Sequence, residues 1–163
     1  MKLIKHFVLF LSALLFISSC ADDDDKMSCP AVVKVSAKVN GETVVFQALG
    51  RAIDFIGNGD GHTLTLHLIS GVYSPQQDSY DIQIMLPYKK TGKNVVEGIR
   101  YFRVQNQTST QILLSQSQIQ SKVRINRNTC VSLEFSGTGS VDGTSVTISD
   151  GLLEYTYEEP FNE

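Results

Sequence analysis

The amino-acid sequence predicts an all-β fold, a single antiparallel β-sandwich or an open barrel-like sheet, over residues 31–159. Short segments in which apolar and polar side chains alternate dominate the chain from residue 31 onward, and this period of two is the pattern of half-buried strands. Turn residues of the Gly, Asn and Asp type separate these segments at intervals of roughly 8–12 residues. No window carries a sustained helical period with caps, and no solenoid repeat is present.

The first predicted unit is a hairpin over residues 33–48. Apolar side chains alternate over residues 33–39, and the dipeptide Asn40-Gly41 follows at once. Asn-Gly is a preferred pair for a type I′ turn because both central residues of that turn need a positive φ. The alternation resumes over residues 44–48, which we expect to form the second strand.

The middle of the chain predicts three more strands. Residues 52–56 form an apolar segment, and the Gly-rich residues 57–61 follow as a turn. Leucines at alternate positions over residues 64–68 predict the next strand. The alternation over residues 80–86 ends at Pro87, which lacks a backbone N–H to donate to a sheet.

The last third of the domain continues as strands with a less uniform pattern. Residues 101–104 and 111–114 are apolar enough for strands, whereas the Gln- and Ser-rich residues 115–120 show no clear period. The remaining alternations lie at residues 123–125, 131–135, 146–148 and 153–157. Between them, Gly and Asp residues predict a loop over residues 137–143 and a turn at Asp150-Gly151.

The first 19 residues have the pattern of a secretory signal peptide. A basic start precedes an apolar stretch of about 11 residues, which is too short to span a bilayer. The stretch ends in Ile17-Ser18-Ser19-Cys20, which resembles the lipobox of bacterial lipoproteins. This resemblance implies that the Cys20 thiol is acylated and that cleavage just before it makes Cys20 the first residue of a lipid-anchored protein. An ordinary secretory signal with a chance cysteine is the alternative.

Residues 20–30 are predicted to form an acidic tether. The consecutive residues Asp22, Asp23, Asp24 and Asp25 repel one another and favour an extended chain, which from Cys20 to Pro30 reaches at most about 35 Å. Their position resembles the acidic export signal of Bacteroidota surface lipoproteins and implies an outer-membrane, surface-exposed location. A solvated linker without a sorting role and an enteropeptidase tag ending at Lys26 are the two alternatives.

Motifs at both ends of the domain resemble small Bacteroidota surface lipoproteins of unknown function. These motifs are Val39-Asn40-Gly41-Glu42, Phe135-Ser136-Gly137-Thr138 and Val146-Thr147-Ile148-Ser149-Asp150-Gly151. All three are turn and strand motifs, and the centre of the chain has no counterpart in the resemblance. The resemblance implies a lipid-anchored β domain and transfers no catalytic residues.

Two cysteines remain once Cys20 is assigned to the lipid. Cys29 and Cys130 are an even pair in an oxidising compartment, and we consider a disulfide between them. The bridge would close a loop of about 100 residues and stabilise the fold by about 4–5 kcal/mol in the chain-entropy model. Two free thiols are the alternative.

The charge of the chain bears on its partners. Without residues 1–19 the chain has 12 basic and 17 acidic residues, a net charge of −5. Nucleic-acid-binding domains carry basic surfaces, so we expect no nucleic-acid partner. The expected partners are a membrane, through the lipid, and an unidentified protein or glycan. No cofactor is expected, because the chain has no Walker loop, dinucleotide fingerprint or nucleophile elbow.

One segment invites a calcium interpretation. Asp54, Asn58 and Asp60 surround the glycines of the predicted turn at residues 57–61, and oxygen ligands on a bending loop are what calcium prefers. The spacing does not match an EF-hand, and a plain hairpin turn is the alternative. His62 is expected on this turn and His67 on the face of a strand opposite to the leucines.

Aromatic residues supply the remaining candidate contacts. The chain has no Trp, so a sugar-binding face would depend on tyrosines. Tyr73 and Tyr88 lie near prolines in predicted loops, where we expect them to be exposed, and they are the candidates for ligand contact. Tyr80, Tyr155 and Tyr157 follow apolar alternations and are expected in the core.

These features together predict a lipid-anchored surface module with a binding or accessory role in an outer-membrane assembly and without catalytic activity. A surface hydrolase acting on glycan or peptide is one alternative, because carboxylates or His67 can meet in space without a sequence motif. A pilus-like subunit is the other. Neither the ligand nor the strand order follows from the sequence.

Overall fold

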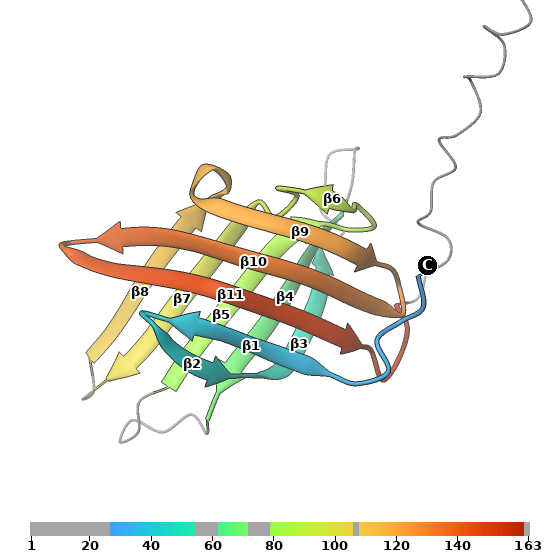
Figure 1. Ribbon diagram of the computed structural model, residues 1–163, viewed down its shortest axis with the longest axis horizontal. Coiled ribbons are helices and arrows are strands. Elements are labelled where there is room, and N and C mark those ends of the chain that lie inside the picture. The colour runs from blue at the N-terminus through green and yellow to red at the C-terminus, as the bar shows by residue number, and fades with distance from the viewer. Residues whose placement is uncertain (1–26, 55–61, 72–78, 106–107, 162–163) are drawn as a thin grey trace, which may run out of the picture.

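The computed structural model describes residues 27–54, 62–71, 79–105 and 108–161, and it confirms the all-β prediction. Two antiparallel sheets pack face to face as a sandwich, and their strands cross obliquely (Figure 1). Within the described residues, no helix is long and apolar enough to cross a membrane.

The larger sheet contains six strands in the order β2-β1-β11-β10-β9-β6. In chain order these are β1 (Lys34–Val39), β2 (Glu42–Val45), β6 (Gly92–Lys93), β9 (Ile119–Asn126), β10 (Cys130–Val141) and β11 (Thr144–Thr156). The long hairpin of β10 and β11 forms its centre and extends over the whole length of the sandwich (Figure 1).

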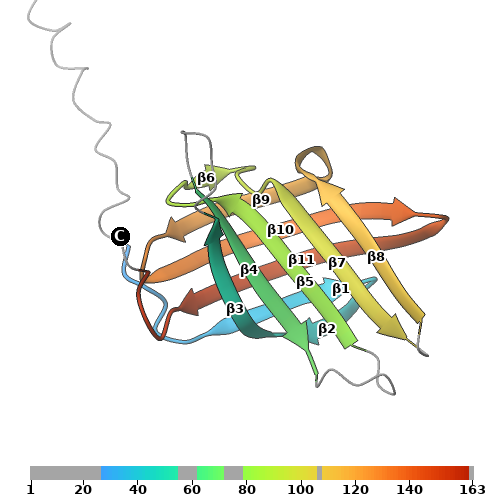
Figure 2. The ribbon, with the colours of Figure 1, turned by 180° about the vertical axis from the view of Figure 1, so that it is seen from behind.

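The smaller sheet contains five strands in the order β3-β4-β5-β7-β8 (Figure 2). These are β3 (Gln47–Asp54), β4 (Thr63–Ser70), β5 (Ser79–Pro87), β7 (Gly98–Gln105) and β8 (Thr108–Ser115). A short 3₁₀ turn at Gln116–Gln118 returns the chain to the larger sheet. The sequence shows no alternation over residues 115–120 because this segment contains both the 3₁₀ turn and the first residues of β9.

The core lies between the two sheets and consists of the apolar positions of the alternating segments. The largest fully buried side chains are Leu64, Leu66, Leu68, Ile82, Ile84, Leu86, Ile99, Ile112, Leu114, Leu133, Ile148 and Leu153. Each such side chain contributes roughly 1.5–3 kcal/mol relative to an exposed position. Their alternation with exposed or half-buried neighbours is the pattern that the sequence predicted.

The first hairpin has the predicted turn, but its second strand is divided. Asn40 and Gly41 have φ values of 51° and 89°, as a type I′ turn requires. β2 ends at Val45, and Phe46 donates its N–H to the carbonyl of Val35 at 2.8 Å. The chain then passes to the other sheet as β3, so residues 44–48 are not one strand.

The predicted loop at residues 137–143 was wrong, because β10 continues to Val141. Gly137 and Gly139 occur in this strand because β8 packs closely on it. A Cβ on residue 139 would lie 2.9 Å from Cγ2 of Ile112 and 3.0 Å from Cγ of Leu114. These glycines allow close packing of the two sheets, and the actual turn is confined to residues 142–143.

The predicted turn at Asp150-Gly151 was also wrong, because β11 runs through it. The pairing register of β10 and β11 shifts between Phe135 and Gly137, and Asp150 has a φ of 50°. These two observations identify a β-bulge, which inserts a residue without ending the strand. Gly151 is required there because a Cβ would lie 2.5 Å from the carbonyl oxygen of Phe135.

Candidate binding site

A polar pocket is lined by residues of the β1–β2 turn, β7, β8 and the start of β11. These segments meet at the end of the sandwich where the β10–β11 hairpin turns, far from the described termini (Figure 1). Its volume is about 300 Å³. We call it the distal pocket. Its lining residues are Asn40, Tyr101, Arg103, Thr108, Thr110, Ile112, Thr144 and Ser145.

The distal pocket forms because the inward-facing positions change from apolar to polar near this end. On β8, Leu114 and Ile112 are buried in the core, whereas Thr110 is half-buried and Thr108 is exposed. On β11, exposed Thr144 continues the inner face that begins with Ile148 and Val146. Since threonine stabilises a strand as well as an apolar β-branched residue does, the strands continue while the core does not.

The Tyr101 ring and the Arg103 guanidinium line the distal pocket, and both lie near the Tyr80 ring. Tyr101 is only 3% exposed, and its ring centroid lies 6.2 Å from that of Tyr80. The guanidinium of Arg103 lies 5.4 Å from the centroid of the Tyr80 ring, a distance suited to cation–π attraction. At the rim, Asn40 is held by its Oδ1, which accepts a hydrogen bond from the Thr147 N–H at 2.8 Å.

The lining of the distal pocket can form hydrogen bonds with a polar ligand. Its described residues offer hydroxyl, amide and guanidinium groups, which donate and accept hydrogen bonds. None of these lining residues is an Asp, Glu or His, and those are the side chains that most often transfer protons in enzymes.

The opposite end of the sandwich, which we call the proximal end, is closed by covalent and polar contacts to the N-terminal residues. Cys29 and Cys130 form a disulfide with an S–S distance of 2.01 Å. This confirms the disulfide that the sequence analysis considered between these two cysteines. The Thr156 hydroxyl donates to the Pro30 carbonyl at 2.7 Å. Arg127 donates to the Met27 carbonyl at 3.2 Å. Residues 27–30 are therefore fixed to the domain.

Aromatic packing also closes the proximal end. Tyr157 is 5% exposed and packs edge to face against Tyr155 and Phe161, at centroid distances of 5.4 and 5.2 Å. The guanidinium of Arg51 lies 4.4 Å from the Tyr157 ring centroid and 4.8 Å from that of Phe161. Burial raises the pKa of the Tyr157 hydroxyl far above its ordinary value, and the Arg51 charge opposes this shift only in part.

Tyr88 belongs to the proximal end. Its ring lies 5.8 Å from that of Phe161, edge to face, and it is half-buried rather than exposed as expected. Sequence reasoning missed this packing because Phe161 is distant in the chain. Tyr88 lines neither the distal pocket nor the outer depression described below.

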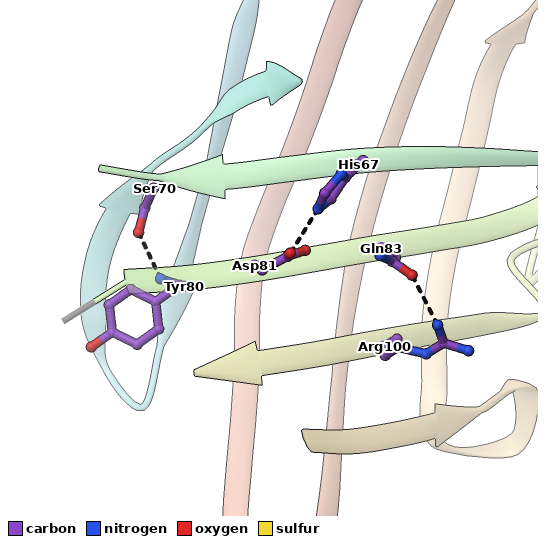
Figure 3. Close-up of polar contacts among 6 residues, drawn as sticks. All are labelled: His67, Ser70, Tyr80, Asp81, Gln83 and Arg100. Carbon is purple, nitrogen blue, oxygen red and sulfur yellow. Dashed lines mark hydrogen bonds and ion pairs between the residues drawn. The ribbon is translucent and has the colours of Figure 1, made fainter. Parts of the chain in front are cut away.

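His67 lies on the outer face of the smaller sheet, as predicted, and has a carboxylate partner (Figure 3). Its Nε2 lies 2.7 Å from Oδ2 of Asp81 on the adjacent strand, and both side chains are partly exposed. On the same face, Arg100 donates to Gln83 at 3.1 Å. Sequence reasoning missed the pair because it depends on the register that joins β4 and β5.

The larger sheet carries a broad depression of about 830 Å³ on its outer face, which we call the outer depression. Two carboxylates line it, Glu134 and Asp150. Each forms an ion pair with a basic side chain. Arg124 lies 2.5 Å from Glu134, and Lys38 lies 2.8 Å from Asp150. The hydrogen bond and charge of Asp150 raise the pKa of Lys38.

The other predicted site residues fall mainly outside the described ranges. Cys20, Asp22 to Asp25, Asn58, Asp60 and Tyr73 lie there, and Asp54 is the last residue of β3. Among the residues that the structure describes, no group of three or more His, Cys, Asp or Glu side chains is placed to hold a metal ion. The calcium interpretation therefore stays a prediction.

A scan against protein-family models, a search of curated proteins and a search of solved structures found no match to this chain. The functional argument therefore depends on the distal pocket and its position in the fold.

Proposed function

We propose that the protein is a lipid-anchored module of the bacterial outer-membrane surface that binds a glycan in its distal pocket without chemically changing it. The single observation that carries the proposal is the position of the distal pocket. The segments that line it meet at one end of the sandwich, and residues 27–30, which the disulfide fixes, lie at the other end (Figure 1).

The position of the disulfide sets how the domain is presented on a membrane. Cys20 precedes Cys29 by nine residues, so a lipid on Cys20 holds the proximal end within about 30 Å of the bilayer. The negative charge of Asp22 to Asp25 repels an anionic membrane surface and favours an extended tether. The distal pocket then faces away from the membrane, where it meets ligands from outside.

The chemistry of the distal pocket favours a sugar. Thr108, Thr110, Thr144 and Ser145 carry hydroxyls that both donate and accept hydrogen bonds, and sugar hydroxyls need such partners. The buried ring of Tyr101 adds an apolar wall. A volume of about 300 Å³ lies at the lower end of the range for small-ligand sites, so we expect one or two sugar units to be bound.

A surface hydrolase and a pilus-like subunit are the competing proposals. A hydrolase would use the His67–Asp81 pair or the carboxylates of the outer depression, and these groups lie on the outer faces of the two sheets, away from the distal pocket. A pilus-like subunit would accept a strand from a neighbour at a sheet edge.

Binding of the full-length protein to an array of neutral and acidic bacterial glycans tests the proposal. Thr110→Val keeps the shape of the side chain and removes its hydroxyl, so we expect about three- to tenfold weaker binding. Thr65→Val, on the outer face of β4, is the matched control and should bind as the wild type does. If no glycan binds, or if both variants bind equally, the glycan assignment is wrong.

Two further readouts test the hydrolase alternative and the lipid anchor. Release of shortened glycan that stops in Asp81→Asn would support the hydrolase. Incorporation of labelled fatty acid that is lost in Cys20→Ser tests the anchor independently of any ligand.

A further inference from the structure

Three of the four sheet edges are short, interrupted or covered. β2 has four residues and β6 has two. β3 has an irregular register between Ala48 and Gly50, and its Arg51 donates to the carbonyl of Glu159 in the C-terminal segment. Natural sheets protect their edges from pairing with other chains in these ways.

The fourth edge, β8, has none of these features. It has eight residues, and all eight pair with β7 in one uninterrupted register. On its other side, no backbone hydrogen bond from Thr108–Leu114 reaches any residue in the described part of the chain. Against the described residues, β8 therefore presents an unpaired row of backbone donors and acceptors along this edge.

The sequence around β8 also lacks charge. Residues 105–121 contain no Asp, Glu, Lys or Arg, in a chain with 19% charged residues. Charged side chains on an edge strand oppose pairing, most of all between identical strands that bring like charges together. An uncharged edge removes this repulsion for a second copy of the same strand. In addition, Leu113 is 58% exposed on the outer face of β8.

We propose that β8 pairs antiparallel with β8 of a second copy of this chain and joins the two smaller sheets into one continuous sheet. Antiparallel pairing of identical strands has two-fold symmetry, so the contact closes and does not propagate into a fibre. Side chains that face each other across such a pair lie on the same sheet face. In the register centred on Gln111, this residue faces Gln111 of the second copy on the outer face, and Leu113 faces Ser109 of the second copy.

The pairing does not depend on the glycan assignment, although it affects the same end of the molecule. Thr108 and Thr110 of the distal pocket lie on β8. In the dimer, the two pockets would therefore lie on either side of the β8–β8 contact. A contact made by one strand is smaller than the interfaces of permanent dimers. We therefore expect a weak dimer, which forms at high protein concentration.

Sedimentation of the full-length protein in detergent over a range of concentrations tests this inference. The wild type should change from monomer to dimer as its concentration rises. Gln111→Lys and Gln111→Glu each place like charges across the two-fold axis, and each should weaken dimerisation by about tenfold or more. Thr65→Lys adds the same charge to the outer face of β4, which lies away from the β8 edge, and should dimerise as the wild type does.

A mixture of the Gln111→Lys and Gln111→Glu proteins distinguishes repulsion from misfolding. Opposite charges then face each other, and the mixture should form a heterodimer although neither variant dimerises alone. A wild type that stays monomeric at every concentration overturns the inference, and so does a mixture that stays monomeric. Dimerisation that Gln111→Lys does not weaken overturns it as well, because the contact then lies elsewhere.

Discussion

The two ends of the sandwich use opposite chemistry. At the proximal end, a disulfide, stacked aromatic rings and the Arg51 guanidinium close the space between the sheets. At the distal end, the inward positions of β8 and β11 carry threonines, and a pocket of about 300 Å³ stays open. The comparison teaches that one sandwich can close one end by covalent and aromatic contacts while polar inward positions leave a pocket at the other. Changes at the proximal end should therefore affect stability, and changes at the distal end should affect binding.

The largest effect is expected from removal of the disulfide. The double substitution Cys29→Ser and Cys130→Ser opens a loop with a sequence separation of 101 residues, and we expect the free energy of unfolding to fall by about 4–5 kcal/mol. Urea unfolding of the full-length variant and the wild type measures this change. Glycan affinity of the fraction that remains folded should be unchanged, and a large loss of affinity would contradict the separation of the two ends.

β8 and β10 hold the two sheets close together, and Gly139→Ala tests this packing. A Cβ at residue 139 would lie 2.9 Å from Ile112, so we expect a loss of about 1–3 kcal/mol from overpacking. Gly50→Ala is the matched control, because a Cβ there has no atom within 4 Å among the described residues. Thermal melting should show a lower Tm for Gly139→Ala alone. Equal melting of both variants would show that the sheets can separate without cost.

The Tyr157 hydroxyl gives the proximal end a pH dependence. Burial raises its pKa in the folded state, whereas in the unfolded state the group titrates near its ordinary value of about 10. Below about pH 10 both states keep the proton, so no stability is lost. Above it the unfolded state ionises first, and we expect the wild type to lose about 1 kcal/mol by about pH 11.

The substitution Tyr157→Phe removes this ionisation. Urea unfolding at about pH 7 and about pH 11 should show a smaller alkaline loss in the variant than in the wild type. At about pH 7 the variant should be at least as stable, because no hydrogen-bond partner of the buried Tyr157 hydroxyl lies in the described ranges. Equal alkaline losses in the two proteins would place the responsible group elsewhere.

The smallest effect on stability is expected at the distal pocket. Thr144→Val removes one exposed hydroxyl, so the free energy of unfolding should change by less than about 0.5 kcal/mol. Glycan affinity should nevertheless fall about three- to tenfold, as for Thr110→Val. Calorimetric titration and urea unfolding on the same sample measure both values. A stability loss without a loss of affinity would show that the residue is structural.

Much of the fold was predictable because alternation is a local property. The alternating segments around Leu66, Ile84 and Leu133 became strands with these leucines and isoleucine in the core. Asn40-Gly41 formed its turn because φ preferences belong to the residues themselves. Gly137, Gly139 and Gly151 misled the prediction because glycine also occurs where another strand or a ring leaves no room for a Cβ.

The candidate site was less predictable. Thr108 and Thr110 lie in the first half of β8, where all residues are polar, so the sequence does not show which of them face inward. Thr144 falls next to residues that were expected to form a loop. Tyr88 was expected in solvent and packs against Phe161, which lies 73 residues later in the chain.

The sequence by itself determined the strand periodicity, the first turn and the pair of cysteines available for a bridge, because each depends on neighbouring residues or on composition. Only the tertiary structure decided which strands share a sheet, that β8 lies at an open edge and that the distal threonines converge on one pocket. These features depend on the register and packing of segments far apart in the chain, and no local pattern encodes that geometry.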